Sequence, residues 1–186
     1  GRENGKKEGE HMSIFWNKKT VSMLKWGTFW LSETPEKPSK GWDAECFRTA
    51  TWALMKDKKT GKKFYFVNTH LDHKGENSRY HSAIQIAQAI SMTNEKFVLT
   101  GDFNAPPDTP EIKAITEQLA YRGVIDCTAD LGTTFHCFAK WDKKDWVKID
   151  YIFTDGKCIE SHKVEDIMED GKFYSDHNAV VAIIEL

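Results

Sequence analysis

The chain has 186 residues, of which 40% are hydrophobic and 12% aromatic, and its formal net charge at pH 7 is -2. This length and composition suffice for one domain with a sizeable core, residues 1–186, and exclude a disordered or fibrous protein. The small negative charge creates no overall positive field to hold nucleic acid non-specifically, so an anionic substrate must be bound by local groups.

The first half of the chain predicts mainly β-structure. Residues 1–10 are polar and contain glycine, which is typical of a loop or a frayed terminus. Strands are then predicted at residues 13–16, 21–25, 28–31, 48–55 and 63–69. The last two are joined by a turn that contains Gly61, and we therefore expect them to form a hairpin.

Helices enter in the middle of the chain. Apolar residues from Tyr80 to Ile90 recur at helical spacing, which predicts an amphipathic helix with Asn77 or Ser78 as its N-cap. A second helix is expected from Thr109 or Pro110 to about Ala120. Further strands are predicted at residues 96–100, 133–135, 147–153 and 178–185. Strands in series with a few helices favour an α+β layered fold with a mixed sheet or two packed sheets.

Short polar clusters flank three of the predicted strands. They are His70-Leu71-Asp72-His73, Gly101-Asp102-Phe103-Asn104 and Ser175-Asp176-His177, and Asp150 lies inside a fourth, otherwise apolar strand. An ionisable residue at the end of a buried strand is expensive unless it has a task, and active sites are commonly built at such edges. Carboxylates, an amide and imidazoles together are suited to hydrolysing a phosphate ester with a hard divalent cation.

The spacing within the clusters suggests separate roles. In an extended backbone Asp102 and Asn104 face the same way, so both could face one phosphate. Asp102 could orient or deprotonate water, and Asn104 could donate hydrogen bonds to the transition state. His177 is a candidate proton shuttle with Asp150 as its orienting carboxylate. The alternatives are an ordinary Asp/Asn turn after a strand and a histidine satisfied within the core.

Four motifs together resemble the endonuclease/exonuclease/phosphatase superfamily. They occur in the family's order, and they comprise residues 67–73, 99–104, 148–153 and 175–177. The superfamily includes DNase I, abasic-site endonucleases, neutral sphingomyelinases, inositol polyphosphate 5-phosphatases and deadenylases. The first half of the chain is similar to a bacterial branch of small hydrolases. The fold that this resemblance implies is a four-layer DNase I-like sandwich of two mixed sheets flanked by helices.

The resemblance also implies roles for individual residues. His177 would be the general base or phosphate-polarising group, Asp150 its partner, and Asp102 and Asn104 would hold water and the transition state. Asp176 would ligate Mg²⁺ or Mn²⁺. His70 would bind the scissile phosphate, Glu10 would orient His70, and Arg48 would contact the phosphate through its planar fork.

One departure from the family is large. Members of the family begin with strands that end in an Asn and in a Gln-Glu pair, whose Glu is the principal metal ligand, and no such motif occurs here. We therefore expect a form of the domain without those N-terminal strands. Asp176 alone would bind Mg²⁺ weakly, so low activity is expected from these residues by themselves, together with self-association through an exposed sheet edge.

Two functions follow from these observations. The first is a metal-dependent phosphoesterase that hydrolyses a phosphodiester or a phosphomonoester by in-line attack of water, acting on a small molecule, a lipid headgroup or nucleic acid. The alternative is a non-catalytic phosphate- or nucleic-acid-binding module without its principal metal ligand. No apolar run is long enough to span a membrane. The residues favour none of the secreted, periplasmic and cytoplasmic locations.

Overall fold

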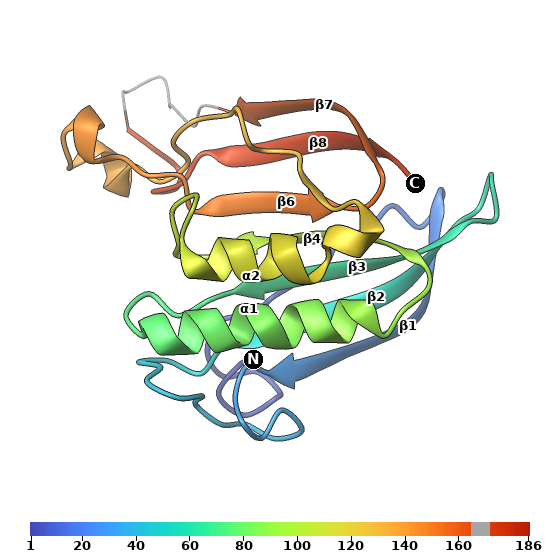
Figure 1. Ribbon diagram of the computed structural model, residues 1–186, viewed down its shortest axis with the longest axis horizontal. Coiled ribbons are helices and arrows are strands. Elements are labelled where there is room, and N and C mark those ends of the chain that lie inside the picture. Colours follow the sequence, from blue (N-terminus) through green and yellow to red (C-terminus); the bar gives the residue numbers. More distant parts are fainter. Residues whose placement is uncertain (165–171) are drawn as a thin grey trace.

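The computed structural model describes residues 1–164 and 172–186 (Figure 1). Its strands are β1 (Val21–Trp30), β2 (Thr49–Asp57), β3 (Lys63–His70), β4 (Lys96–Asp102), β5 (Ile125–Asp126), β6 (Asp150–Thr154), β7 (Lys157–Val164) and β8 (Ala179–Glu185). Its α-helices are α1 (Glu76–Ser91) and α2 (Pro110–Gln118), and short 3₁₀ turns occur at Ala120–Arg122, Cys137–Ala139 and Lys143–Asp145.

The strands form two sheets. The larger has the order β1-β2-β3-β4-β6-β5 and is mixed, because β3 and β4 are parallel while the other neighbours are antiparallel. The smaller consists of the antiparallel pair β7 and β8. The expected α+β fold with two sheets is confirmed. The hairpin of β2 and β3 is also as predicted.

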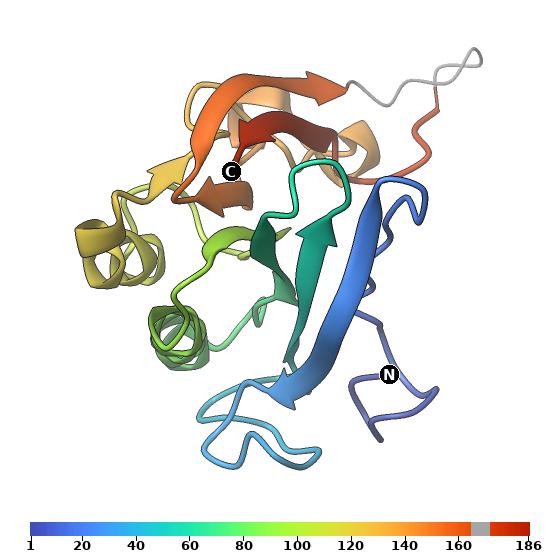
Figure 2. The ribbon, with the colours of Figure 1, turned by 90° about the vertical axis from the view of Figure 1, so that its right-hand side faces the viewer.

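Successive side chains of β4 point to opposite faces of the large sheet, and each face packs against a different layer. Phe97 and Leu99 point into the main core between the large sheet and the two α-helices, which lie side by side on that face (Figure 1). Val98 points the other way and packs with Ile152 against side chains of β8. The small sheet therefore covers part of the opposite face of the large sheet (Figure 2).

Several predicted strands differ from the structure. The runs at residues 21–25 and 28–31 are one strand, β1, with a bulge between Met23 and Lys25. Residues 13–16 form no strand, although the Ser13 carbonyl accepts a hydrogen bond from the Asn68 side chain. Residues 133–135 contribute only isolated bridges of Phe135. The strand β7 was not predicted, because a strand with a solvent-exposed polar face carries little apolar signal.

The start of α1 is stabilised from a distant loop. Its N-cap is Gly75, which has no side chain, instead of the expected Asn77 or Ser78. The carboxylate of Asp43 accepts the backbone N–H of Asn77 at 3.3 Å and of Ser78 at 2.6 Å. For α2 the expected Thr109 cap position and Pro110 start are confirmed. Within the described residues, no helix has both the length and the apolar character needed to cross a bilayer.

Candidate functional site

Three neighbouring strands place His70, Asp102 and Asp150 in one row. His70 is the register partner of Asp102 in the parallel pair of β3 and β4. Asp102 is in turn the partner of Asp150 in the antiparallel pair of β4 and β6. Side chains of directly paired residues lie on the same face of a sheet, so the pairing of the strands itself assembles this row.

His177 joins the row from the segment before β8. Its Nδ1 lies 2.8 Å from Oδ2 of Asp150, and its Nε2 lies 3.8 Å from Oδ2 of Asp102. The imidazole also packs against the ring of Phe135, with a centroid separation of 4.8 Å. His177 therefore presents one nitrogen to Asp150 and the other to Asp102.

His70 lies between two carboxyl groups. Its Nε2 is 3.3 Å from Oδ2 of Asp102, and its Nδ1 is 3.3 Å from Oε2 of Glu10. Glu10 lies in a segment that the sequence predicted as a loop. Its carboxylate is at Nδ1 of His70, where an acid that orients this ring would make contact. The side chain of Asp102 is therefore close to both imidazoles.

Asn104 is oriented by its backbone conformation. The expectation that Asp102 and Asn104 face the same way assumed an extended chain, but β4 ends at Asp102 and Asn104 has a φ of 47°. The backbone N–H of Asn104 donates to Oδ1 of Asp102 at 2.8 Å. Its side-chain amide donates to the Leu71 carbonyl at 3.0 Å. One N–H of Asn104 thus already holds the Asp102 carboxyl in place.

Burial and charge shift the pKa values of three groups. Burial, and then the charge of Asp150, raise the pKa of Asp102 to about 6. Burial, followed by the positive charges of Arg48 and Arg2, lowers the pKa of His70 to about 3, which makes this imidazole neutral at physiological pH. For His177 burial lowers the pKa, but the hydrogen bond and charge of Asp150 outweigh it and the net shift is upward.

Arg48 lies in a buried network of charged side chains next to this row. Its side chain is 4% exposed, and its guanidinium lies 3.5 Å from Glu10, 3.4 Å from Asp72 and 3.2 Å from Nδ1 of His73. Asp72 also accepts the backbone N–H groups of Glu45, Cys46, Lys74 and Gly75. Arg48 is therefore held by a buried network and reaches His70 through Glu10.

Asp102, Asp150 and His177 could hold a metal ion. Each offers one ligand atom, and these atoms all lie within 4.8 Å of one another. Asp176 is not part of this group, although its charge contributes to raising the pKa of His177 and its carbonyl accepts the N–H of His136. Among the described residues, Cys46, Asp72 and His73 form a second such group, but the Arg48 guanidinium and the backbone donors already occupy Asp72.

Sequence reasoning missed two residues that support the site. The buried hydroxyl of Thr134 accepts the backbone N–H groups of Ile149 and Asp150, at 3.1 and 3.2 Å, and so fixes the start of β6. Phe135 bridges to His177 by backbone pairing as well as by ring contact. The predicted strand at residues 133–135 was the available signal, but nothing local connected it with His177.

A cavity of about 350 Å³ adjoins the row. His70, Asp102 and Asp150 line it together with Asn68, Thr100 and His11. Met12, Ile152 and Val180 add apolar surface, and the volume leaves room for a small ester next to the two acids and the imidazole.

The sequence and the structure both match known proteins. The sequence model of the Endonuclease/Exonuclease/phosphatase family matches residues 26–177. A crystal structure of the endonuclease/exonuclease/phosphatase from Bacteroides vulgatus is similar, with a TM-score of 0.91, 38% sequence identity and coverage of 100% of this chain and 74% of that chain. The mannosyl-6-phosphatase of Bacteroides thetaiotaomicron VPI-5482 has a TM-score of 0.85 and 30% identity, covering 100% of this chain and 75% of that chain.

A viral protein shows local similarity. An uncharacterised protein of Acanthamoeba polyphaga mimivirus is 33% identical over 81 residues, which are 40% of this chain and 30% of that protein. The chain thus matches less than a third of the length of this curated relative.

Proposed function

The chain belongs to the endonuclease/exonuclease/phosphatase family, and we propose that it hydrolyses a phosphate ester, with Mg²⁺ or Mn²⁺, by in-line attack of water. The observation that carries the proposal is the position of Asp102, 3.3 Å from one imidazole and 3.8 Å from the other. Membership of the family supports a phosphoesterase, while the metal and the mechanism are parts of the proposal.

His177 is proposed as the group that takes the proton from water. Asp150 at Nδ1 holds the ring in one orientation, which leaves Nε2 directed at Asp102, whose side chain borders the cavity. The negative charges around the ring stabilise its protonated form, as the raised pKa indicates. A base of this kind accepts a proton without leaving the hydrogen bond that positions it.

His70, Asn104 and Arg48 are proposed to bind the phosphate. A neutral His70 has a single N–H, so it donates from one ring nitrogen only and accepts at the other. The side-chain amide of Asn104 uses one of its N–H donors on the Leu71 carbonyl and has another for the transition state. Arg48 now lies 3.5 Å from Glu10, and a phosphate oxygen would replace that carboxylate as its partner.

The residues present fit a hard divalent cation. Two carboxyl groups on paired positions disfavour each other's ionisation, and part of the raised pKa of Asp102 comes from Asp150. Asp102 and Asp150 would hold the ion, whereas Asp176, the ligand expected from the sequence, lies outside the group of ligand atoms that they form with His177. The ion would supply neutralisation of the negative charge on the phosphate oxygens.

The first substrate class to assay is a sugar phosphate. A protein that is 30% identical over this whole chain is named as a mannosyl-6-phosphatase. The net charge of -2 argues against a duplex nuclease that depends on a broad positive surface. Small-molecule, lipid-headgroup and single-stranded nucleic-acid esters complete the panel.

A direct test compares the protein encoded by the complete open reading frame with its His177→Ala variant. Both are assayed with a chromogenic phosphodiester, a chromogenic phosphomonoester and mannose 6-phosphate, with Mg²⁺, Mn²⁺ or a chelator. We expect metal-dependent hydrolysis that falls about 10²–10⁴-fold in the variant. Equal rates in the two proteins would refute the role of His177, and phosphate binding without hydrolysis would support the binding-module alternative. Sedimentation of the same samples tests self-association through a sheet edge.

A further inference from the structure

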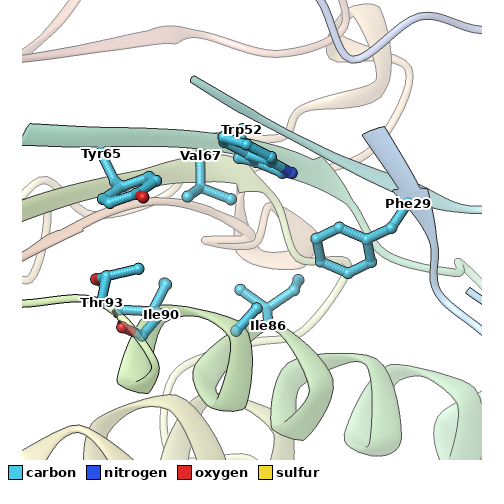
Figure 3. A pocket seen from close by; sticks show the side chains of 8 residues that line it. Phe29, Trp52, Tyr65, Val67, Ile86, Ile90 and Thr93 are labelled. Carbon is cyan, nitrogen blue, oxygen red and sulfur yellow. Dashed lines mark hydrogen bonds between the residues drawn. The ribbon is translucent and has the colours of Figure 1, made fainter. Parts of the chain in front are cut away.

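A second cavity lies on the other face of the large sheet. Its volume is about 230 Å³, and it separates strands β1 to β3 from the C-terminal half of α1 (Figure 3). The sheet contributes Phe29, Trp52, Tyr65 and Val67, and the helix contributes Ile86 and Ile90. Along β3, Val67 and His70 are an odd number of residues apart and face opposite sides, so this cavity is separate from the candidate active site.

A glycine on the edge strand allows one wall of the cavity to lie close to the sheet. Gly27 of β1 is the register partner of Trp52, and a Cβ at Gly27 would lie only 2.9 Å from Nε1 of Trp52. The indole therefore lies close against the backbone of β1, where Figure 3 shows its nitrogen on the side of Phe29. Glycine inside a strand permits such a close approach. An indole held against the sheet leaves space between the sheet and α1 that it would otherwise fill.

Small residues keep the helical side open. Ala89 and Thr93 line the cavity one turn apart, and Ala89 is solvent-exposed, which places it at the mouth. The rings of Trp52 and Tyr65 are 6.0 Å apart and inclined at 51°. The cavity is thus bounded by tilted aromatic rings on the sheet and by aliphatic side chains on the helix, with an opening through which a molecule can enter.

The chemistry of the lining defines the ligand. None of the residues that line the cavity carries a charge, so a charged ligand would lose its hydration without compensation. Polar atoms are few: the Tyr65 hydroxyl, the Trp52 indole nitrogen and the Thr93 hydroxyl, which donates to the Ile90 carbonyl at 2.8 Å and keeps acceptor capacity. Aromatic walls with a few placed polar groups are typical of sites for small apolar ligands.

We propose that this cavity binds an uncharged aromatic molecule of one or two rings that bears a single hydrogen-bonding group. An apolar cavity of about 150 Å³ is sufficient for benzene, so the larger volume here accepts a bicyclic ring. The ring would lie between Trp52 and the side chains of Ile86 and Ile90, with its polar group directed at Tyr65 or Thr93. The proposal does not depend on the phosphoesterase activity.

Titration with indole and with phenol tests the proposal. The readout is the methyl NMR resonances of Ile86 and Ile90, followed in the wild-type protein and in the Ala89→Trp and Gln88→Trp variants. Ala89→Trp places a ring at the mouth, whereas Gln88 is exposed on the same turn and does not line the cavity. Both positions are exposed on the helix surface, so neither variant disturbs the core.

The expected result is a saturable shift of both isoleucine resonances with indole in the wild type and in Gln88→Trp. Binding should weaken by at least about tenfold in Ala89→Trp, because the added ring occupies the ligand's space. The proposal is overturned if neither probe causes a saturable shift, if Ala89→Trp binds as the wild type does, or if the shifts map to His70 and His177 instead.

Discussion

The carboxylate of Asp150 lies 2.8 Å from Nδ1 of His177, although Asp150 begins β6, His177 lies before β8 and the two residues are separated by 27 positions. This contact opposes the effect of burial on the imidazole and sets the net direction of its pKa shift. It also fixes which nitrogen of His177 faces Asp102.

The Asp150→Asn variant tests this contact. The amide keeps the shape of the side chain but removes the negative charge, so burial is no longer outweighed and the pKa of His177 should fall. Measurement of the His177 ring resonances against pH gives the shift directly. Hydrolysis should fall about 10²–10⁴-fold, because the ring loses the partner that selects its tautomer. The exposed Asp130→Asn change is the matched control, and an unchanged pKa in Asp150→Asn would contradict the assignment.

The ionised carboxylate of Asp102 is expected to destabilise the folded protein. Its pKa rises from 3.8 to about 6 on folding, so between these pH values the unfolded chain releases the proton first and stability falls as the pH increases. In the presence of a chelator, Asp102→Asn should gain about 3 kcal/mol in unfolding free energy at pH 8 and roughly half of that at pH 5. Urea unfolding at the two pH values measures both. A gain independent of pH would exclude this origin.

Binding of divalent ions should offset the loss of stability that ionised Asp102 causes. A cation that binds the folded state stabilises it by ligand linkage, so Mg²⁺ or Mn²⁺ should raise the unfolding midpoint of the wild type at pH 8. The rise should be much smaller in Asp102→Asn, which lacks one of the two facing carboxylates. Equal stabilisation of both proteins would place the bound ion elsewhere.

Asp72 is expected to stabilise the protein strongly. Its side chain is 0% exposed; burial alone would raise its pKa, but four backbone N–H donors outweigh this effect and the pKa is lowered. Asp72→Ala should lower the unfolding free energy by about 3–5 kcal/mol, because Arg48 and these donors lose their acceptor. Urea denaturation measures the loss, with exposed Asp130→Ala as the control.

The acid dependence of stability follows from the same residue. A carboxyl whose pKa is lower in the folded state stabilises fully above its unfolded pKa of about 3.9, and this contribution is lost as the pH falls towards the folded value. The wild type should therefore lose stability below about pH 4 more steeply than Asp72→Asn does. Parallel acid profiles of the two proteins would show that folding does not lower the pKa of Asp72.

Arg122 connects three segments of the chain: the end of α1, the residues that precede β4, and the residue that follows β6. Its guanidinium pairs with Asp155 at 2.8 Å and donates to the carbonyls of Ile90, Thr93 and Glu95. Arg122→Ala should destabilise by about 3–5 kcal/mol, since Asp155 is 4% exposed and would remain buried without its partner. Arg122→Lys should recover only part of this, because an ammonium cannot reproduce the planar fork. Chemical denaturation checks both, and Lys113→Ala on the exposed side of α2 should have little effect.

Local patterns were sufficient for much of the fold. The hairpin of β2 and β3 and both helices follow from apolar periodicity and turn residues, which depend on neighbours along the chain. The strand β7 and the cap of α1 by Asp43 did not follow, because one has an exposed polar face and the other depends on a residue more than 30 positions away. The backbone conformation of Asn104 was not predicted, because the end of β4 could not be located to the residue.

By itself, the sequence determined which chemical groups are available: acids, an amide and imidazoles at the ends of apolar strands, in the order of a known family. The tertiary structure alone decided that Asp102 lies between His70 and His177, that Arg48 is tied to Asp72, and that Asp176 stands apart from the other ligand atoms. The physical reason is strand register. A shift of one residue would turn His70 or Asp150 to the opposite face, and register depends on contacts across the sheet that no local stretch of sequence contains.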